Sequence, residues 1–223
     1  MIKLAIVDLD GTLAYTIPGM MMGINAVRRK MGCEDITEKK ILECISNATP
    51  GFVGHLIEDT PLKDNLDEAI RMYLEEYSKC CVEGSTPYEG IKEEMQKMRD
   101  SGISLVVFSN KDNIRVNWIM EKYFSGIFNE CIGTGIYPFK PDPTGPLDIA
   151  SRYGAKPDET VFIGDSDVDV MTAKNAGMIS LNVAWGYVDR DILKKAGSQY
   201  MAEKPQDLLK IINEINIAQE KGV

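Results

Sequence analysis

The chain has 223 residues, of which 44% are hydrophobic and 26% are charged, and its formal net charge is −9. This composition is typical of a soluble globular protein, and the length fits one large domain or a domain that carries an insertion. The negative charge argues against nucleic acid or an anionic membrane surface as a partner. An acidic enzyme that acts on phosphates would need a metal cation or local lysine and arginine residues to attract them.

Signals for membrane insertion and secretion are missing from the sequence. No apolar stretch reaches the ~20 residues that a transmembrane helix needs, and the first predicted strand begins too early for a signal peptide to precede it. The five cysteines form an odd set without CxxC spacing, which indicates reduced thiols in a cytoplasmic protein. The single histidine, His55, argues against histidine-based catalysis and multi-histidine metal sites.

The first predicted element is a short buried strand that ends in two carboxylates. Leu4 to Val7 are consecutive apolar residues, as in the two-sided core of a parallel sheet, and Asp8 and Asp10 follow them. If the chain stays extended, both carboxylates point to the same side and lie roughly 6.5 to 7 Å apart, close enough to share one cation or one substrate. An ordinary turn is the simpler alternative, because Asp-Gly is a frequent turn dipeptide.

Residues 15–83 are predicted to form a helical insertion. Apolar residues recur at helical spacing through most of this segment, and one predicted helix begins with Asp35 and Glu38 in a capping-box-like arrangement. A helical unit inserted after the first strand would cover the strand ends as a cap. The cluster Met20–Met22 could line a ligand cavity there, although packing in a hydrophobic core explains it more simply.

From residue 84 the chain returns to alternating strands and helices. Apolar runs alternate with helical patterns, the runs at 103–108, 161–164 and 179–185 and the helical patterns at 88–102, 113–124 and 169–177. Such alternation predicts right-handed βαβ units and a parallel sheet, whose sites lie beyond the carboxyl ends of the strands. We therefore expect an α/β fold, with a Rossmann-like parallel-sheet core (residues 1–14 and 84–223) and an inserted all-helical cap domain (residues 15–83).

Reactive side chains follow two further predicted strands and occupy one proline-rich loop. Ser109 and Asn110 follow one strand, Asp165 and Asp169 follow another, and Lys140 lies in the loop. Each group except Asp165 has a simpler explanation: a helix N-cap for Ser109 and Asn110, a solvated surface charge for Lys140, and a favourable helix dipole for Asp169. A carboxylate directly after a buried strand is not explained in this way.

The carboxylates together form a coherent site for phosphoryl transfer. Asp8 and Asp165 can hold Mg²⁺, which prefers a few carboxylates together with water and a phosphate oxygen. Asp8 can attack phosphorus and form an aspartyl-phosphate. Asp10 can protonate the leaving alcohol and then activate water, as a general acid and base.

The remaining polar groups suit the phosphate itself. Lys140 offsets the negative charge between Asp8 and the phosphoryl group. Ser109 and the backbone N–H groups around Asn110 can hold the non-bridging phosphate oxygens. The expected partner is a small phosphorylated metabolite, and the sequence leaves the oligomeric state open.

Four motifs in this order resemble those of the haloacid dehalogenase-like hydrolases: DLDGTL (8–13), VVFSN (106–110), FKPDP (139–143) and GDSDVD (164–169). The resemblance covers nearly the whole chain, because many members of this family carry a helical cap after the first motif. It implies that Asp8 is the nucleophile, that Asp10 is the acid–base, and that Ser109 and Lys140 bind phosphate.

The same resemblance implies a metal site. Asp8 and Asp165 correspond to metal ligands, and the third protein contact in the family is the backbone carbonyl at the position of Asp10. Asp169 corresponds to a residue that supports the metal or the lysine. Asp167 falls on a variable position, so no role is assigned to it.

Within the family, the C-terminal part of the chain is similar to phosphoglycolate phosphatases, notably at 183–187 and 197–212. Trp185 and Tyr187 in the first of these stretches can be explained by packing alone. The segment 45–56 resembles the specificity loop of those enzymes only loosely. Several cap residues are therefore equal candidates for a substrate contact: Arg28, Arg29, Arg71 and His55.

The leading interpretation is a Mg²⁺-dependent phosphatase that acts on a small phosphate monoester, with phosphoglycolate as a candidate substrate. A sugar-phosphate mutase of the β-phosphoglucomutase type is the closest alternative, because it would share all four motifs. A non-catalytic binding module that keeps the fold is the third, although the complete set of acids and the lysine argues against it.

Overall fold

The first buried strand lies at the centre of the fold. In the computed structural model, Leu4–Val7 form β1, and all of their side chains are fully buried. Leu4 and Ile6 belong to one hydrophobic cluster, whereas Ala5 and Val7 belong to another. Because side chains alternate along a strand, the two clusters lie on opposite faces of the sheet. The continuous apolar run therefore reflects a sheet that is buried on both sides.

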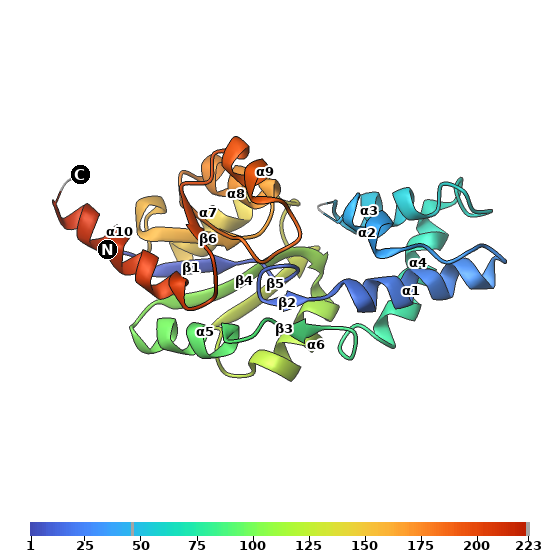
Figure 1. The fold of residues 1–223 in the computed structure, drawn as a ribbon, viewed down its shortest axis with the longest axis horizontal. Coiled ribbons are helices and arrows are strands. Elements are labelled where there is room, and N and C mark those ends of the chain that lie inside the picture. The colour runs from blue at the N-terminus through green and yellow to red at the C-terminus, as the bar shows by residue number, and fades with distance from the viewer. Residues whose placement is uncertain (46, 222–223) are drawn as a thin grey trace.

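A parallel sheet surrounds β1. The structure describes residues 1–45 and 47–221, and its main sheet is six-stranded, with the order β5-β4-β1-β6-β7-β8 and parallel pairing throughout (Figure 1). The other strands are β4 (Ser104–Asp112), β5 (Glu130–Thr134), β6 (Thr160–Gly164), β7 (Ile179–Val183) and β8 (Tyr200–Ala202). The expected parallel sheet is confirmed. The edge strands β5 and β8 escape the sequence pattern because both are only partly buried, and β8 is also short.

Helices cover both faces of this sheet. The cluster that contains Val7 is covered by α5 (Ile91–Asp100), α6 (Asn113–Phe124) and α10 (Asp207–Lys221). The cluster that contains Ile6 is covered by α7 (Thr144–Arg152) and α8 (Asp167–Ala176). The 3₁₀ turn η1 (Pro157–Glu159) precedes β6, and α9 (Arg190–Ala196) packs against α8. The sheet with these helices is called the sheet unit below.

A second group of helices follows β1 in the sequence and stands beyond the strand ends, at the right of Figure 1. It comprises α1 (Ile17–Lys30), α2 (Glu38–Leu42), α3 (Thr49–Leu56) and α4 (Leu66–Ser78), called the helical unit below. These helices share a hydrophobic core that is separate from the two clusters of the sheet. Among the described residues, none of the helices has the length and apolar character needed to cross a bilayer.

The start of α2 differs from the sequence prediction. Asp35 and Glu38 do not form a capping box, since α2 begins at Glu38 after Thr37, whose side chain makes no capping hydrogen bond. The carboxylate of Asp35 instead accepts hydrogen bonds from the guanidinium of Arg29, with one Nε–Oδ1 distance of 2.9 Å. The prediction was wrong because an ion pair with α1 competes for this carboxylate.

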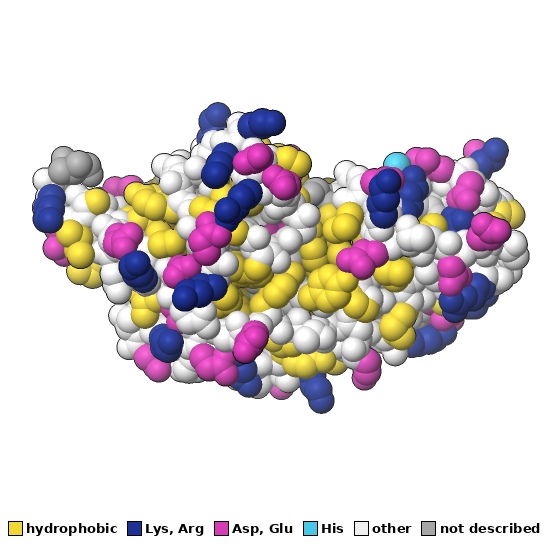
Figure 2. All heavy atoms as spheres, in the orientation of Figure 1, with side chains coloured by type: hydrophobic (Ala, Val, Ile, Leu, Met, Phe, Trp, Pro, Cys, Tyr) yellow, Lys and Arg dark blue, Asp and Glu magenta, His cyan; other side chains and the backbone are white. Residues whose placement is uncertain are grey.

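The two units are joined where the chain crosses between them. The outgoing segment β2 (Ala14–Tyr15) pairs in antiparallel fashion with the returning segment β3 (Thr86–Pro87). Just beyond this pair, the amide of Gly19 donates a hydrogen bond of 3.1 Å to the carbonyl of Gly84. The surface is notched where the two units meet, and hydrophobic side chains gather on this face beside the notch (Figure 2).

A side chain from the sheet unit also holds the helical unit. Arg115 on α6 donates a hydrogen bond of 3.0 Å to the carbonyl of Leu74 and one of 3.1 Å to the hydroxyl of Ser78, both on α4. The carboxylate of Asp112 orients the same guanidinium from the other side at 2.8 Å. The position of α4 over the strand ends is therefore fixed by specific polar contacts as well as by the crossing segments.

We expect the Gly84→Ala variant to lower the free energy of unfolding. A Cβ atom at Gly84 would lie 2.3 Å from the Cα atom of Gly19 and 2.5 Å from its nitrogen, so the two backbones would have to separate. Such overpacking typically costs about 1–3 kcal/mol, which denaturant unfolding would measure. Gly54→Ala in α3 is the control, because its Cβ would meet its nearest neighbour at an ordinary 3.6 Å. Equal unfolding midpoints for the two variants would contradict this account of the junction.

Candidate active site

The predicted site residues come together at the carboxyl ends of three neighbouring strands. Asp8 follows β1, Ser109 lies near the end of β4, and Asp165 directly follows β6. Lys140 joins them from the loop that precedes α7. Neighbouring parallel strands end at the same edge of a sheet, so residues far apart in the sequence meet at one place.

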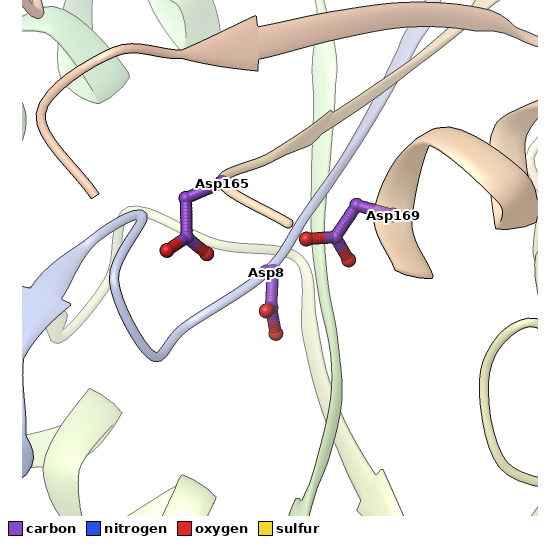
Figure 3. A group of neighbouring side chains, drawn as sticks. All are labelled: Asp8, Asp165 and Asp169. Carbon is purple, nitrogen blue, oxygen red and sulfur yellow. The ribbon is translucent and has the colours of Figure 1, made fainter. Parts of the chain in front are cut away.

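Three buried carboxylates converge at this edge (Figure 3). Asp8, Asp165 and Asp169 each place a carboxylate oxygen within 4.8 Å of the other two. Burial raises the pKa of Asp8 to about 7, a shift that Lys140 opposes and that Asp169 and Asp10 increase. Burial, together with Asp169 and Asp8, raises the pKa of Asp165 well above its usual value. The site therefore concentrates negative charge where solvent cannot stabilise it.

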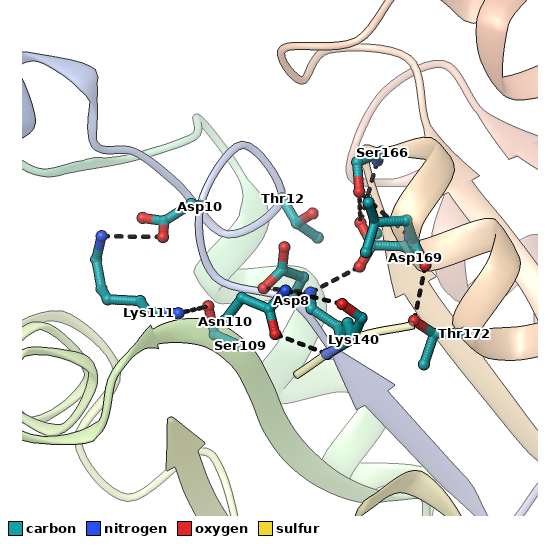
Figure 4. Close-up of polar contacts among 12 residues, drawn as sticks. Asp8, Asp10, Thr12, Ser109, Asn110, Lys111, Lys140, Ser166, Asp169 and Thr172 are labelled. Carbon is teal, nitrogen blue, oxygen red and sulfur yellow. Dashed lines mark hydrogen bonds and ion pairs between the residues drawn. The ribbon is translucent and has the colours of Figure 1, made fainter. Parts of the chain in front are cut away.

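Lys140 supplies a positive charge to this group (Figure 4). Its ammonium nitrogen lies 2.7 Å from Oδ1 of Asp169 and 3.0 Å from Oδ1 of Asp8. Burial lowers the pKa of Lys140, but the carboxylates of Asp169 and Asp8 outweigh it and raise the pKa above its usual value. Lys140 is only 6% exposed, so the alternative of a solvated surface charge is wrong. One ammonium group against three carboxylates still leaves an excess of negative charge.

Asn110 fixes the loop that carries Lys140. Its side-chain amide donates to the carbonyl of Lys140 at 3.2 Å and accepts from the amide nitrogen of Lys140 at 2.8 Å. Both polar ends of the Asn110 side chain are therefore engaged by the backbone of Lys140. The structure leaves its backbone, and not its side chain, as the part of Asn110 that could contact a phosphate.

Asp169 orients Lys140 and stays fully bonded itself. Its Oδ1 accepts from Lys140, and its Oδ2 accepts from the hydroxyl and amide of Ser166 at 2.7 and 3.1 Å. Ser166 in turn caps α8, so Asp169 does more than complement the helix dipole. Because both of its oxygens already have donors, Asp169 is less suited to a metal than the two other carboxylates.

Asp8 and Asp165 retain the capacity to bind a divalent cation. Oδ1 of Asp8 is buried and has no hydrogen-bond donor among the described residues, because the nearby Lys140 is not aligned for one. Asp165 accepts one good hydrogen bond, 2.7 Å from the amide of Tyr187, and a longer one of 3.3 Å from Thr12. Buried carboxylate oxygens with unused lone pairs are the ligands that hard divalent cations prefer. The residues present therefore fit such an ion.

Asp10 lies in the same cavity but points away from the three carboxylates. Its Oδ1 accepts a hydrogen bond of 2.5 Å from the hydroxyl of Thr16, and its Oδ2 lies 2.9 Å from the ammonium of Lys111 (Figure 4). Lys111 was not identified from the sequence. It could have been, because Ser109 and Lys111 are two residues apart on a strand and so face the same side.

The turn that follows Asp10 belongs to the site. Gly11 has a φ of +79°, and a Cβ atom there would lie 2.1 Å from Oδ2 of Asp165. The Asp-Gly turn that the sequence offered as the simpler alternative is present, and it does not conflict with the catalytic interpretation of Asp10, which stays a prediction. The turn needs glycine because its backbone passes against a buried carboxylate.

The helix N-cap proposed for Ser109 and Asn110 is wrong. Strand β4 continues to Asp112, and it is Asp112 whose carboxylate accepts from the first amides of α6 at 3.1 and 3.3 Å. Ser109 is buried, and its hydroxyl accepts a hydrogen bond of 3.3 Å from the amide of Lys111. Its hydroxyl hydrogen is therefore available to an oxygen in the cavity.

Trp185 and Tyr187 do more than pack. The indole of Trp185 donates to the carbonyl of Thr12 at 3.1 Å, and the amide of Tyr187 donates to Asp165. The hydroxyl of Tyr187 accepts from the amide of Thr16 at 2.7 Å. Both residues therefore tie the C-terminal segment to the turn that carries Asp10.

A cavity covers the carboxylates between the two units. Its helical wall is largely aromatic and aliphatic and includes Met20, Phe52, Tyr73 and Tyr77. Met20 is at once part of the helical core and part of this wall, so both explanations of the methionine cluster apply to it. Met22 is 54% exposed and does neither.

The basic cap residues considered as substrate contacts do not line this cavity. Each is held by a carboxylate of the helical unit: Arg28 by Asp59, Arg29 by Asp35, Arg71 by Glu68 and His55 by Glu58. The sequence could not separate these candidates, because their partners are brought to them by the fold. The structure instead places Lys111, from the sheet unit, at the cavity wall.

Comparison with known proteins identifies a matching family and several relatives. The family model for haloacid dehalogenase-like hydrolases matches residues 5–183. A phosphoglycolate phosphatase from Vibrio parahaemolyticus is 24% identical over 95% of this chain and 96% of the relative. A solved structure from Lactobacillus delbrueckii subsp. bulgaricus, provisionally named phosphoglycolate phosphatase, is 26% identical with a TM-score of 0.84, covering 94% of this chain and 98% of the other. A predicted phosphoglycolate phosphatase from Haemophilus somnus, 23% identical, shares the fold with a TM-score of 0.88 and covers 95% of this chain and 98% of the other.

We expect a divalent cation to raise the melting temperature, because the carboxylates are brought together only in the folded chain. At a concentration 100 times the Kd, the stabilisation would be about 2.7 kcal/mol. Thermal unfolding with increasing Mg²⁺ measures it. Asp165→Asn should remove most of the shift, whereas Asp167→Asn, in the same segment but outside the carboxylate group, should keep it. The same shift in both variants would show that the cation binds elsewhere.

Proposed function

The chain belongs to the haloacid dehalogenase-like hydrolase family, and we propose that it is a phosphatase that hydrolyses a small phosphate monoester through an aspartyl-phosphate intermediate. The observation that carries the proposal is the convergence of Asp8, Asp165 and Lys140 at one sheet edge, with Asp10 in the same cavity. The relatives named phosphoglycolate phosphatase make 2-phosphoglycolate the first substrate to test.

In the first step, a carboxylate oxygen of Asp8 attacks phosphorus. The bond from Asp8 to phosphorus forms as the ester bond to the leaving oxygen breaks. Asp10 donates its proton to that oxygen, so the alcohol leaves as a neutral molecule. The two carboxylates can divide these tasks because Asp8 faces Lys140 and Asp169, whereas Asp10 faces Thr16 and Lys111.

In the second step, Asp10 takes a proton from water. The water oxygen forms a bond to phosphorus while the bond between Asp8 and phosphorus breaks, which releases inorganic phosphate and restores Asp8. Asp10 recovers the proton that it gave to the alcohol, so the cycle is balanced. The same residue can serve as acid and then as base because the two steps are the reverse of each other in proton flow.

Other groups hold the phosphoryl group in place. Lys140 lies 3.0 Å from Asp8 and offsets the negative charge that accumulates as the phosphate approaches. The hydroxyl of Ser109 and the backbone amide of Asn110 donate to the non-bridging oxygens. Asp169 acts indirectly, because it positions Lys140.

Mg²⁺ is the proposed cofactor. The carboxylates of Asp8 and Asp165 and the backbone carbonyl of Asp10 would hold it, as the resemblance to the family implies. The ion would offset the charge of the phosphate and of the carboxylates around it. Mg²⁺ suits the site because it takes oxygen ligands and usually keeps several waters beside one or two carboxylates.

We also propose that residues 15–83 act as a cap over a core formed by residues 1–14 and 84–223. The separate hydrophobic core of the helical unit and the paired crossing segments β2 and β3 support this division. A cap over the site would exclude bulk water and protect the aspartyl-phosphate from uncontrolled hydrolysis. It would also restrict the substrate to small molecules.

A phosphate-release assay over a panel of esters tests the function. With Mg²⁺, we expect kcat/KM to be higher for 2-phosphoglycolate and other small phosphorylated acids or sugars than for nucleotides or a phosphopeptide, because the cap limits the space. Release of inorganic phosphate separates a phosphatase from a mutase, which would return an isomerised sugar phosphate. A phosphopeptide as the best substrate would contradict the cap, and no phosphate release from any ester would contradict the proposed function.

Substitution of the two aspartates should separate their roles. Asp8→Asn removes the nucleophile and a metal ligand, so the rate should fall by about 10⁴-fold or more and the thermal shift with Mg²⁺ should be lost. Asp10→Asn keeps the backbone carbonyl but cannot transfer a proton, so a rate loss of about 10²–10⁴-fold should leave the Mg²⁺ shift in place. Steady-state kinetics on samples checked for deamidation measures both. Loss of metal binding in Asp10→Asn alone would reverse the assignment.

A further inference from the structure

Lys111 occupies a position that the proposed chemistry leaves without a task. Its side chain is only 5% exposed, and its ammonium lies 2.9 Å from Oδ2 of Asp10. Among the described residues, the lysines that line the cavity are Lys111 and Lys140. Lys140 is engaged by Asp8 and Asp169, on the side of the transferred phosphoryl group. Lys111 is therefore the cation that remains for the part of the substrate that leaves.

Tyr77 on α4 adds a second group at the same place. The ammonium of Lys111 lies 5.0 Å from the centroid of its ring, a favourable cation–π arrangement. Tyr77 lines the cavity, and its hydroxyl is buried and finds no hydrogen-bond partner in the part of the chain that the structure describes. Burial raises the pKa of Tyr77 well above its usual value, so the hydroxyl keeps its proton and can donate. A buried donor without an acceptor is costly, which points to a ligand atom.

We propose that Lys111 and the hydroxyl of Tyr77 bind a carboxylate of the leaving group and thereby select phosphate esters of 2-hydroxy acids. This inference rests on the proposed function, because it uses the role of Asp10 at the ester oxygen. In such esters the carboxylate is attached to the carbon that bears the ester oxygen. A substrate whose ester oxygen meets Asp10 would therefore bring its carboxylate close to Lys111.

The exchange of partners explains why a carboxylate is preferred over a neutral group. Lys111 is paired with Asp10 in this structure. When Asp10 turns to the ester oxygen, the buried ammonium loses this partner, and a neutral leaving group would leave it uncompensated. A substrate carboxylate replaces Asp10 as the counter-charge and accepts from Tyr77 as well.

The rest of the wall argues for a carboxylate and against a second phosphate. Beyond Tyr77, the described residues on the helical side of the cavity are mostly apolar or aromatic, with Asn47 and Thr49 as further polar side chains, and none of them carries a positive charge. A phosphate carries more charge and more acceptor oxygens than one ammonium and one hydroxyl can satisfy. A carboxylate has two oxygens and one charge, which these two donors match.

The test compares two esters that differ at the leaving group: 2-phosphoglycolate, with a carboxylate, and 2-hydroxyethyl phosphate, with a neutral hydroxyl in its place. The ratio of their kcat/KM values reports the subsite, because any effect of a variant on Asp10 is shared by both esters and cancels. In Lys111→Met the ratio should fall by about 10- to 100-fold, as expected for a lost hydrogen bond to a charged group. In Tyr77→Phe, which keeps the ring, it should fall by about 3- to 10-fold.

Two matched variants serve as controls. Lys111→Arg keeps the charge and should retain most of the ratio, whereas Lys122→Met removes an exposed lysine of α6 and should leave it unchanged. Equal losses on both esters in Lys111→Met would show that Lys111 acts on Asp10 alone. That result would overturn the inference while the phosphatase function stands.

Binding provides a readout that does not depend on turnover. Calorimetry should show that Asp8→Asn protein binds 2-phosphoglycolate more tightly than 2-hydroxyethyl phosphate, and that adding Lys111→Met removes this difference. Equal affinity for the two esters before that substitution would overturn the inference. If the wild type releases no phosphate but keeps the binding preference, the proposed function fails and the subsite remains.

Discussion

The site depends on holding three buried carboxylates together against their mutual repulsion. Asp8, Asp165 and Asp169 meet because β1 and β6 are neighbours in a parallel sheet and α8 begins directly after β6. Lys140 offsets part of the charge, and Asn110 and Asp169 keep it in place from opposite sides. The negative charge that remains on the three carboxylates destabilises the folded chain, and it favours the binding of a cation. In the proposed function, the cation drawn in by this imbalance would allow an acidic protein to bind an anionic phosphate.

The two lysines among the described residues that line the cavity pair with different aspartates. In the proposed mechanism, Lys140 faces the carboxylate that would receive the phosphoryl group, and Lys111 faces the carboxylate that would serve the leaving oxygen. Each lysine is thus paired with one of the two aspartates of the first motif. The pairing gives Asp8 and Asp10 different counter-charges, although they are only two residues apart and Asp10 still raises the pKa of Asp8. The two carboxylates therefore have different surroundings, which fits the separate roles proposed for them as nucleophile and as acid–base.

Much of this arrangement could be predicted from the sequence, because the informative patterns are local. Leu4–Val7 are apolar on both faces, and such a strand must lie inside a parallel sheet whose end then places Asp8 at the site. What could not be predicted depends on partners that only the fold brings together. The carboxylate of Asp35 was expected to cap a helix but is taken by Arg29. The edge strands β5 and β8 are only partly buried, so they lack the continuous apolar run by which the central strands can be predicted from the sequence.

The helical unit and the sheet unit complete the cavity jointly, which links selection to closure. Lys111 belongs to β4 and Tyr77 to α4, so the two groups face each other only while α4 stays over the strand ends. Arg115 holds α4 there through the carbonyl of Leu74 and the hydroxyl of Ser78, close to Tyr77 in the last turns of α4. Any movement that opened the cavity would therefore separate Lys111 from Tyr77 as well. In the proposed mechanism, the contact that excludes water would also discriminate between leaving groups, and a substrate that satisfies both donors would stabilise the closed arrangement in which its phosphate is transferred.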